Sequence, residues 1–189
     1  MFAALAGPGT LVVSILAGQT LGNLRAGLPR AGGLVRAMPN LPASIGRGAT
    51  ALAGEPDLSP GRRATAQTLL AAVGLVEWLD ESLIDAVTAL SGSGPAYVFL
   101  LAECLAEAGV AAGLPTDVAQ RLARATVEGA GELMARQPDL TPTELRKAVT
   151  SPGGTTAAAL AVLCAEGGLR PLLTRAVSDA KRRAGELAG

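Results

Sequence analysis

The fold is decided by residues 11–40, "LVVSILAGQTLGNLRAGLPRAGGLVRAMPN", in which two apolar runs flank a helix-like segment. Residues 11–17 are rich in β-branched side chains and predict a buried parallel strand. Residues 18–28 repeat leucine at helical spacing and predict a short helix. Residues 33–40 predict a second strand, which Pro39 ends. This stretch therefore predicts a strand-helix-strand unit.

The same alternation continues further along the chain. Residues 49–54 predict a third strand, and Ser59 with Pro60 supplies the cap and first turn of a helix that ends before Gly74. Residues 75–79 predict a fourth strand. Strands that alternate with helices are typical of an α/β fold with a mainly parallel sheet. We expect part of a doubly wound, Rossmann-like domain.

After Asp80 the sequence favours helices alone. Thr141 and Glu144 have the spacing of a capping box, which marks one helix start. We therefore expect a Rossmann-like N-terminal domain over residues 1–81 and an all-helical domain over residues 82–189. The expected helices cover residues 81–93, 91–113, 114–136, 141–149, 154–166 and 168–187.

The expected helical domain is rich in alanine, glycine and serine. Burying an alanine stabilises a fold much less than burying a leucine, which contributes about 2 kcal/mol. Such slim helices are short of core in a single chain. We expect an obligate homodimer formed through this domain.

The composition excludes several classes of protein. The 16 basic and 16 acidic residues leave no net charge that would attract nucleic acid or an anionic membrane. The chain has no histidine, which excludes a Ser-His-Asp or Cys-His hydrolase and removes the commonest metal ligand, so no metal site is expected. Glycine, proline or charge interrupts the apolar runs, and the N-terminus has no basic segment of a signal peptide.

Cys104 and Cys164 both fall in apolar helical patterns, which predicts buried, reduced thiols. We therefore expect a cytoplasmic protein without a membrane or nucleic-acid partner.

Residues 150–156, "TSPGGTT", carry more glycine and more hydroxyl groups than a helix cap needs. Ser-Pro-Gly-Gly permits a sharp turn, and the N–H groups of residues 153–156 are expected to be unpaired at the start of the next helix. Together with the positive end of the helix dipole, these groups can hold a small carboxylate or phosphate. A turn and N-cap without a ligand is the alternative that the local chemistry leaves open.

Three other stretches are candidates for a ligand site. Residues 15–20 and 36–42 end two strands at the sheet edge where doubly wound domains bind ligands, although each also fits an ordinary loop. Residues 91–97, "SGSGPAY", fit an anion-binding nest, a close approach between helices, or a flexible linker and cap before a helix. No G-x-G-x-x-G pattern follows a strand in these 189 residues.

Together these stretches resemble the pyrroline-5-carboxylate reductase family. The resemblance extends from about Val12 to Leu187, in the family's order and spacing. "SGSGPAY" and "SPGGTT" in one chain are a specific combination. The matching segments are "VVSILAG", "RAMPNLP", "LSGSGPAYVFLLAE", "AGLP" and "AVTSPGGTTAAAL".

The resemblance implies an oxidoreductase of proline biosynthesis that uses NADPH or NADH to reduce 1-pyrroline-5-carboxylate to L-proline. It also implies a homodimer that assembles further into a homodecamer. Thr156 is the expected catalytic residue, through a hydrogen bond from its hydroxyl to the ring nitrogen. The expected substrate-binding residues are Ser151, Gly153, Gly154, Thr155 and Thr156. The expected cofactor-binding residues are Ala17, Gly18, Met38, Pro39 and Asn40.

By the same resemblance, about a third of a family member, with the first strand and the glycine-rich pyrophosphate loop, precedes residue 1. Two interpretations follow: a truncated chain of the enzyme, or an inactive dimerisation module that no longer binds cofactor. Leu41 and Ala148 depart from residues common in the family. A hydroxyacid dehydrogenase is disfavoured, because neither Lys147 nor Lys181 lies where its catalytic lysine is expected.

Overall fold

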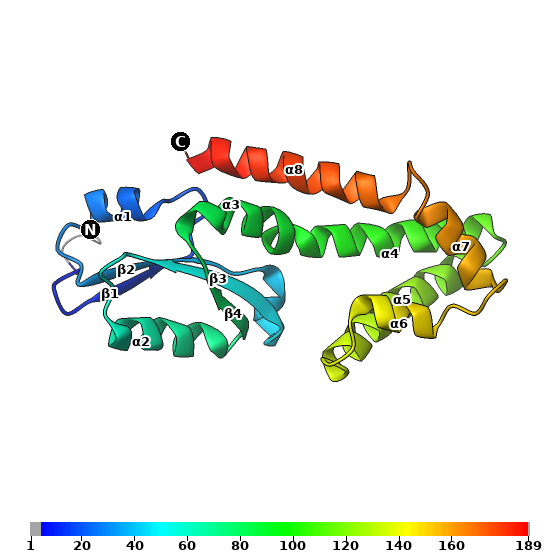
Figure 1. Ribbon diagram of the computed structural model, residues 1–189, viewed down its shortest axis with the longest axis horizontal. Helices are drawn as coiled ribbons and strands as arrows, with labels where there is room; N and C mark the ends of the chain where they lie inside the picture. The colour runs from blue at the N-terminus through cyan, green and yellow to red at the C-terminus, as the bar shows by residue number, and fades with distance from the viewer. Residues whose placement is uncertain (1–4, 189) are drawn as a thin grey trace. The chain divides into compact units, whose positions relative to one another are not determined.

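One four-stranded sheet carries its strands in the order β1-β2-β3-β4 (Figure 1). The computed structural model describes residues 5–188 of the chain, with the side chain of residue 188 left out. All four strands expected from the sequence are present, and the α/β part of the fold is confirmed. The strands are β1 (Leu11–Ser14), β2 (Gly33–Met38), β3 (Gly48–Gly54) and β4 (Gly74–Trp78).

The sheet is mixed. β1 runs parallel to β2 and β3 runs parallel to β4, but β2 and β3 are antiparallel, with Val35 opposite Gly54. Two of the three pairs are parallel, as expected for a mainly parallel sheet, whereas the sequence did not predict the antiparallel central pair. The reason lies in the connection between β2 and β3, which contains only the short 3-10 turn η2 (Leu41–Ile45). A parallel connection needs a longer crossover, usually a helix.

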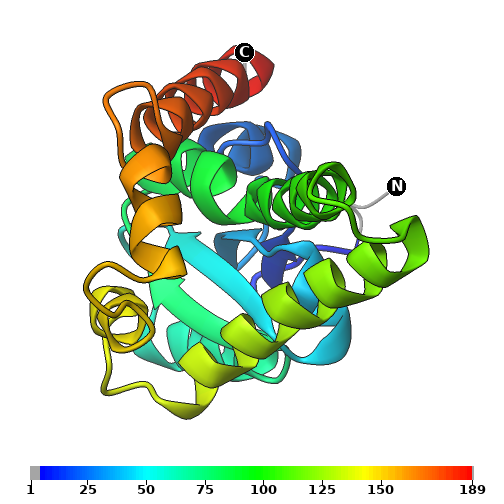
Figure 2. The same cartoon turned by 90° about the vertical axis from the view of Figure 1, so that its right-hand side faces the viewer.

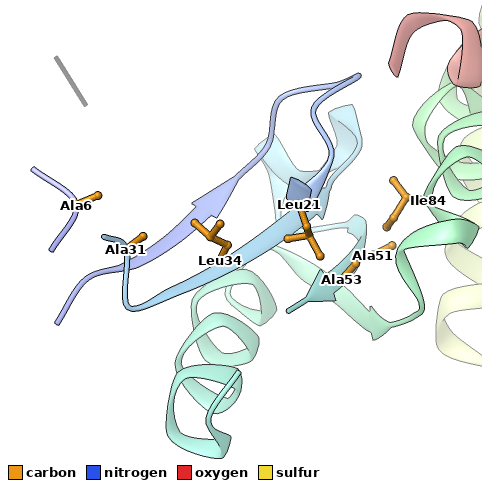
Figure 3. Packing of buried hydrophobic residues seen from close by; sticks show 7 residues of the cluster. All are labelled: Ala6, Leu21, Ala31, Leu34, Ala51, Ala53 and Ile84. Atoms are coloured by element: carbon orange, nitrogen blue, oxygen red, sulfur yellow. The ribbon is translucent and has the colours of Figure 1, made fainter. Parts of the chain in front are cut away.

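Helices cover both faces of this sheet. α1 (Leu21–Gly27) packs on β2, and α2 (Pro60–Ala71) lies across the other face, against β4 (Figure 1). Alternate residues of β2 enter the two cores, because successive side chains of a strand point to opposite faces. Figure 3 shows the first core, formed by Ala6, Leu21, Ala31, Leu34, Ala51, Ala53 and Ile84. The second is formed by Val35, Ala37, Leu52 and Ala66.

A buried arginine ties the segment after β4 to the sheet. The Arg36 guanidinium lies 3.5 Å from Glu81 Oε1 and 3.8 Å from Asp85 Oδ1, and the Arg36 side chain is only 6% exposed. Glu81 Oε1 also accepts a hydrogen bond of 2.6 Å from the Leu21 N–H at the start of α1. These contacts hold η3 (Glu81–Leu83) and α3 (Ile84–Val87) close to β2.

Thr50 is the one residue, among residues 5–188, that has a buried side-chain polar atom without a hydrogen-bond partner. Thr50 as a whole is only 3% exposed. We expect Thr50→Val to raise the free energy of unfolding by about 1 kcal/mol, because valine has the same shape and removes an unsatisfied hydroxyl. Urea unfolding followed by the fluorescence of Trp78, the single tryptophan, measures this change. Thr68→Val on the exposed face of α2 is the control and is expected to change stability little. A loss of stability in Thr50→Val would contradict the prediction.

Glu55 is expected to make stability depend on acidic pH. It accepts hydrogen bonds from Arg25 Nε at 2.8 Å and from the Leu34 N–H at 3.0 Å. The hydrogen bond from Arg25 is the main cause that lowers the pKa of Glu55, and burial opposes it. A carboxyl with a lowered folded-state pKa stabilises the fold above its unfolded pKa of about 4.3, and this contribution is lost as the pH falls through the folded-state value.

We therefore expect Glu55→Gln to lower the free energy of unfolding by about 1.5 kcal/mol at neutral pH. The difference from the unchanged chain should shrink steadily below about pH 4. Denaturant unfolding at a series of pH values measures it. Glu77→Gln, on the exposed side of β4, is the matched control. A gap that stays constant down to the lowest pH would show that the Glu55 charge does not stabilise the fold.

After β4 the chain contains helices and no further strand among the described residues, as the sequence predicts. The capping box is confirmed, because Thr141 Oγ1 accepts the Glu144 N–H while the Glu144 carboxylate accepts the Thr141 N–H. The single helix expected over residues 81–93 is instead divided into η3, α3 and the π-helical turn η4 (Thr88–Gly92). The later helices are α4 (Gly94–Ala111), α5 (Thr116–Arg136), α6 (Pro142–Ala148), α7 (Thr155–Leu163) and α8 (Leu169–Ala188).

The chain divides into two compact units. The sheet unit contains residues 5–95 together with 176–188, and the helical unit contains residues 96–175. The domain boundary expected near residue 81 stays a prediction.

The helical unit has almost no core of its own. Its only residues classed as buried among those described are Ala119 and Ala123. Large apolar side chains are exposed instead, among them Phe99, Leu100 and Val162. Cys104 and Cys164 are also exposed, so the expectation of buried thiols is wrong for the single chain. Slim, alanine-rich helices leave these side chains without a neighbour to cover them.

Among the described residues, one helical stretch, Glu81–Ala111, is long and apolar enough to cross a membrane. This property rests on length and composition alone. Within this stretch, η4 ends at Gly92 and a separate helix, α4, begins at Gly94.

Candidate functional site

The segment between α6 and α7 forms a tight turn over residues 151–154 (Figure 2). The Gly154 N–H donates to the Ser151 carbonyl at 3.1 Å, with Pro152 and Gly153 at the two central positions. Gly153 has a φ of 71°, which glycine adopts without strain. Proline followed by a residue with positive φ is the pattern of a type II turn. The turn directs the chain into α7 at once, with Gly154 as the N-cap.

The start of α7 presents unpaired donors. Within residues 5–188, the N–H groups of Thr155, Thr156 and Ala157 have no hydrogen-bond acceptor, and the first helical bond runs from Ala158 to Gly154. The expectation that the Gly154 N–H is also unpaired is wrong, because the turn uses it. The sequence argument missed Ala157, although its place in the first helical turn predicts an unpaired N–H.

The hydroxyl groups around this turn have different roles. Thr150 Oγ1 donates to the Arg146 carbonyl at 2.6 Å, so it serves the end of α6. The hydroxyls of Ser151, Thr155 and Thr156 make no hydrogen bond within the described chain. An ideal Cβ at Gly154 would lie 2.5 Å from Ser151 Oγ, so glycine leaves the room that this hydroxyl occupies. The unpaired N–H groups, the hydroxyls and the positive helix end together suit a small carboxylate.

The second group of candidate residues lies at an edge of the sheet. Because β1 and β2 are parallel neighbours, Ala17 and Gly18 follow one strand at the same edge where Met38, Pro39 and Asn40 end the other. Gly18 has a φ of 74°. This edge is the one where open α/β sheets bind ligands. The structure assigns this group to the sheet unit and the Ser151–Thr156 group to the helical unit.

Two of the sequence motifs meet at this edge. Asn40 Nδ2 donates to the Ser91 carbonyl at 3.0 Å, and Asn40 Oδ1 accepts the Ala49 N–H at 2.9 Å. The Met38 methyl group lies against Gly92, where an ideal Cβ would come within 2.8 Å of it. The sequence singled out both stretches but did not predict their contact, because it depends on how η4 packs against the end of β2.

The residues at the sheet edge fit one part of a nicotinamide cofactor. Ala17 is exposed and Gly18 has no side chain, so the backbone there is open to a flat ring. Met38 and Pro39, at the end of the parallel strand β2, are apolar and half-buried. The residues described here fit the ring end of such a cofactor, whereas no G-x-G-x-x-G loop for its pyrophosphate follows a strand in the sequence.

The fold and the two candidate sites define a class: a four-stranded α/β sheet with an open strand-end edge, joined to helices that leave large apolar side chains exposed. Residues 81–187 match the family described as "Pyrroline-5-carboxylate reductase dimerisation". The chain belongs to the pyrroline-5-carboxylate reductase family.

Curated relatives and solved structures agree with this assignment. The chain is 48% identical over 177 residues to a pyrroline-5-carboxylate reductase of Synechocystis, a match that covers 94% of this chain and 65% of the relative. It is 46% identical to that of Mycobacterium tuberculosis, covering 93% of this chain and 64% of the relative. The chain therefore spans slightly less than two thirds of these relatives' length.

Two solved structures have the same fold. The pyrroline-5-carboxylate reductase of Coxiella burnetii aligns with a TM-score of 0.88 at 42% identity, covering 95% of this chain and 66% of that one. The pyrroline carboxylate reductase of Plasmodium falciparum, solved with NADP bound, aligns with a TM-score of 0.80 at 28% identity, covering 95% of this chain and 71% of that one.

Proposed function

We propose that this protein is a pyrroline-5-carboxylate reductase that reduces 1-pyrroline-5-carboxylate to L-proline with NADPH or NADH. The observation that carries the proposal is the turn before α7, where unpaired N–H groups of Thr155, Thr156 and Ala157 lie beside the hydroxyls. A ring carboxylate is the small anion that such a helix start accommodates. The reaction itself, reduction of 1-pyrroline-5-carboxylate, is inferred from the family to which the chain belongs.

In this proposal the turn binds and orients the substrate. The substrate-binding residues are Ser151, Gly153, Gly154, Thr155 and Thr156. We propose Thr156 as the catalytic residue, through a hydrogen bond from its hydroxyl to the ring nitrogen, which takes up the electron pair of the C=N bond when the ring carbon accepts hydride. Thr156 is half-buried in α7 whereas its neighbour Thr155 is exposed, and this difference favours Thr156 for the role.

The sheet edge is the proposed cofactor side, formed by Ala17, Gly18, Met38, Pro39 and Asn40. When bound there, a reduced nicotinamide supplies the hydride that the imine carbon accepts. The chain's own contribution is to leave the backbone open at Gly18 and to present apolar side chains from β2. These features orient a ring and exclude water from it.

The same proposal includes a homodimer formed through the helical unit, and further assembly into a decamer, in the cytoplasm. The supporting observation is the apolar surface of α4 and α5, with Phe99, Leu100 and Leu122 each more than half exposed. Large exposed apolar patches mark sites of protein–protein contact. A dimer interface would cover this surface and would bring Cys104, which lies in the same α4 stretch, out of water.

The proposal is tested by mixing the purified chain with 1-pyrroline-5-carboxylate and NADPH while nicotinamide absorbance and L-proline are measured. We expect NADPH loss that matches proline formation, and light scattering that gives twice the mass of the chain or a multiple of that. No turnover and no saturable NADPH binding would support the alternative, an inactive dimerisation module. That alternative is not favoured, because the similarity to the reductases covers the sheet as well as the helices.

A further inference from the structure

Pro95 lies three residues after the end of η4, as the second residue of α4. In an α-helical turn the N–H of residue 95 would donate to the carbonyl of Ser91, but Pro95 has no N–H. A half-buried carbonyl without a donor is costly, so the protein must supply one from elsewhere. The Nδ2 group of Asn40 donates to this carbonyl at 3.0 Å. Asn40 thus replaces the hydrogen bond that Pro95 cannot make.

The rest of the Asn40 side chain is also occupied. Its Oδ1 atom accepts the Ala49 N–H at 2.9 Å, at the beginning of β3. Asparagine is among the best N-cap residues, and Asn40 is the N-cap of η2, yet its side chain makes no capping bond there. Both ends of the amide are therefore committed to other parts of the sheet unit. The side chain joins the end of β2, the start of β3 and η4.

The contact between Met38 and Gly92 follows from this arrangement. With η4 held by Asn40, Gly92 lies so close to the Met38 methyl group that an ideal Cβ would come within 2.8 Å of it. Pro39, between the two contact points, is fixed at both sides. The edge that carries Met38 and Pro39 is therefore shaped by the bond between Asn40 and Ser91.

We propose that Asn40 is a positioning residue: its amide compensates for the N–H missing at Pro95 and so holds Met38 and Pro39 in place at the cofactor edge. What this edge binds rests on the proposed function, but the positioning role does not. The competing role is a direct contact of the Asn40 amide with the cofactor, which would require the amide to leave Ser91 and Ala49.

A double-mutant cycle separates the two roles. Asn40→Ala and Pro95→Ala are made singly and together, and the unfolding equilibrium of each full chain is followed by Trp78 fluorescence in urea. We expect Asn40→Ala to reduce the folding equilibrium constant about tenfold in the unchanged background. In the Pro95→Ala background, where the new N–H can serve the Ser91 carbonyl, the loss should be below about threefold. An equal loss in both backgrounds would overturn the proposal.

The second readout is NADPH binding, measured by the fluorescence of the reduced cofactor. Asn40→Ala should weaken this binding about tenfold, and adding Pro95→Ala should restore it to within about threefold of the Pro95→Ala single variant. A direct ligand could not be rescued in this way, so absence of rescue would favour direct contact and overturn positioning. Asn23→Ala, at an exposed position in α1, is the matched control and should change neither readout.

A third variant isolates the donor. Asn40→Asp keeps an acceptor for the Ala49 N–H but loses the donor to Ser91, so it should behave like Asn40→Ala in both readouts. Stability and NADPH binding of Asn40→Asp equal to those of the unchanged chain would contradict the role of the Nδ2 group. If the unchanged chain binds no NADPH, the proposed function fails, whereas the stability cycle still decides the role of Asn40.

Discussion

Thr156→Val is expected to lower kcat/KM for 1-pyrroline-5-carboxylate about 100-fold, the cost of removing one hydrogen-bond donor aimed at the reacting atoms. Valine keeps the shape of threonine and removes only the hydroxyl, which has no partner within the described chain. If the hydroxyl acts in the transition state, kcat should fall while KM changes little. Steady-state kinetics with saturating NADPH measures both.

The chain provides a matched control for this substitution. Thr143 is the second residue of α6, as Thr156 is the second residue of α7, and Thr143 is exposed. Thr143→Val should leave kcat/KM unchanged, and Thr156→Ser, which retains a hydroxyl, should keep activity within a few-fold of the unchanged chain. Equal losses in Thr143→Val and Thr156→Val would mean that a threonine at this helix position matters only for stability.

Gly74→Ala is expected to lower the free energy of unfolding by about 4 kcal/mol, a large share of the total stability of a domain. Gly74 has a φ of 144°, and an ideal Cβ would lie 2.1 Å from the Gly48 carbonyl oxygen. That oxygen is backbone in β3, opposite Gly74 in the parallel pair of β3 and β4. No side chain can rotate away to relieve the clash, so the two strands must separate. Urea unfolding followed by Trp78 measures the loss.

Gly61→Ala is the control for Gly74→Ala. Gly61 lies in the first turn of α2, where an added Cβ meets nothing within 4 Å. Alanine there should stabilise the chain by up to about 1 kcal/mol, since it favours the helix more than glycine does. A Gly74→Ala chain as stable as Gly61→Ala would show that β3 and β4 can move apart at no cost.

The local pattern of residues predicted most of the elements. The β-branched run at residues 11–17 predicted a strand, although β1 ends at Ser14 and the side chains of Ile15 and Leu16 are exposed. The capping box at Thr141 satisfies its own helix start. The turn before α7 was also predicted from local residues. Pro152 restricts its own φ, and Gly153 can adopt the positive φ that the turn needs. The direction of β3 could not be predicted in this way, since it depends on the length of a connection that has no helical signal.

The sequence by itself determined the strands, the helix starts, the glycine turn at Ser151–Gly154 and the lack of a core in the helical unit. These properties depend on neighbouring residues, through backbone freedom, capping and side-chain size. Only the tertiary structure decided that Asn40 reaches Ser91 and that Glu81 reaches the N–H of Leu21 at the start of α1. Both are hydrogen bonds whose partners the packing chooses, and a pattern of residue types contains several equally good donors and acceptors for each.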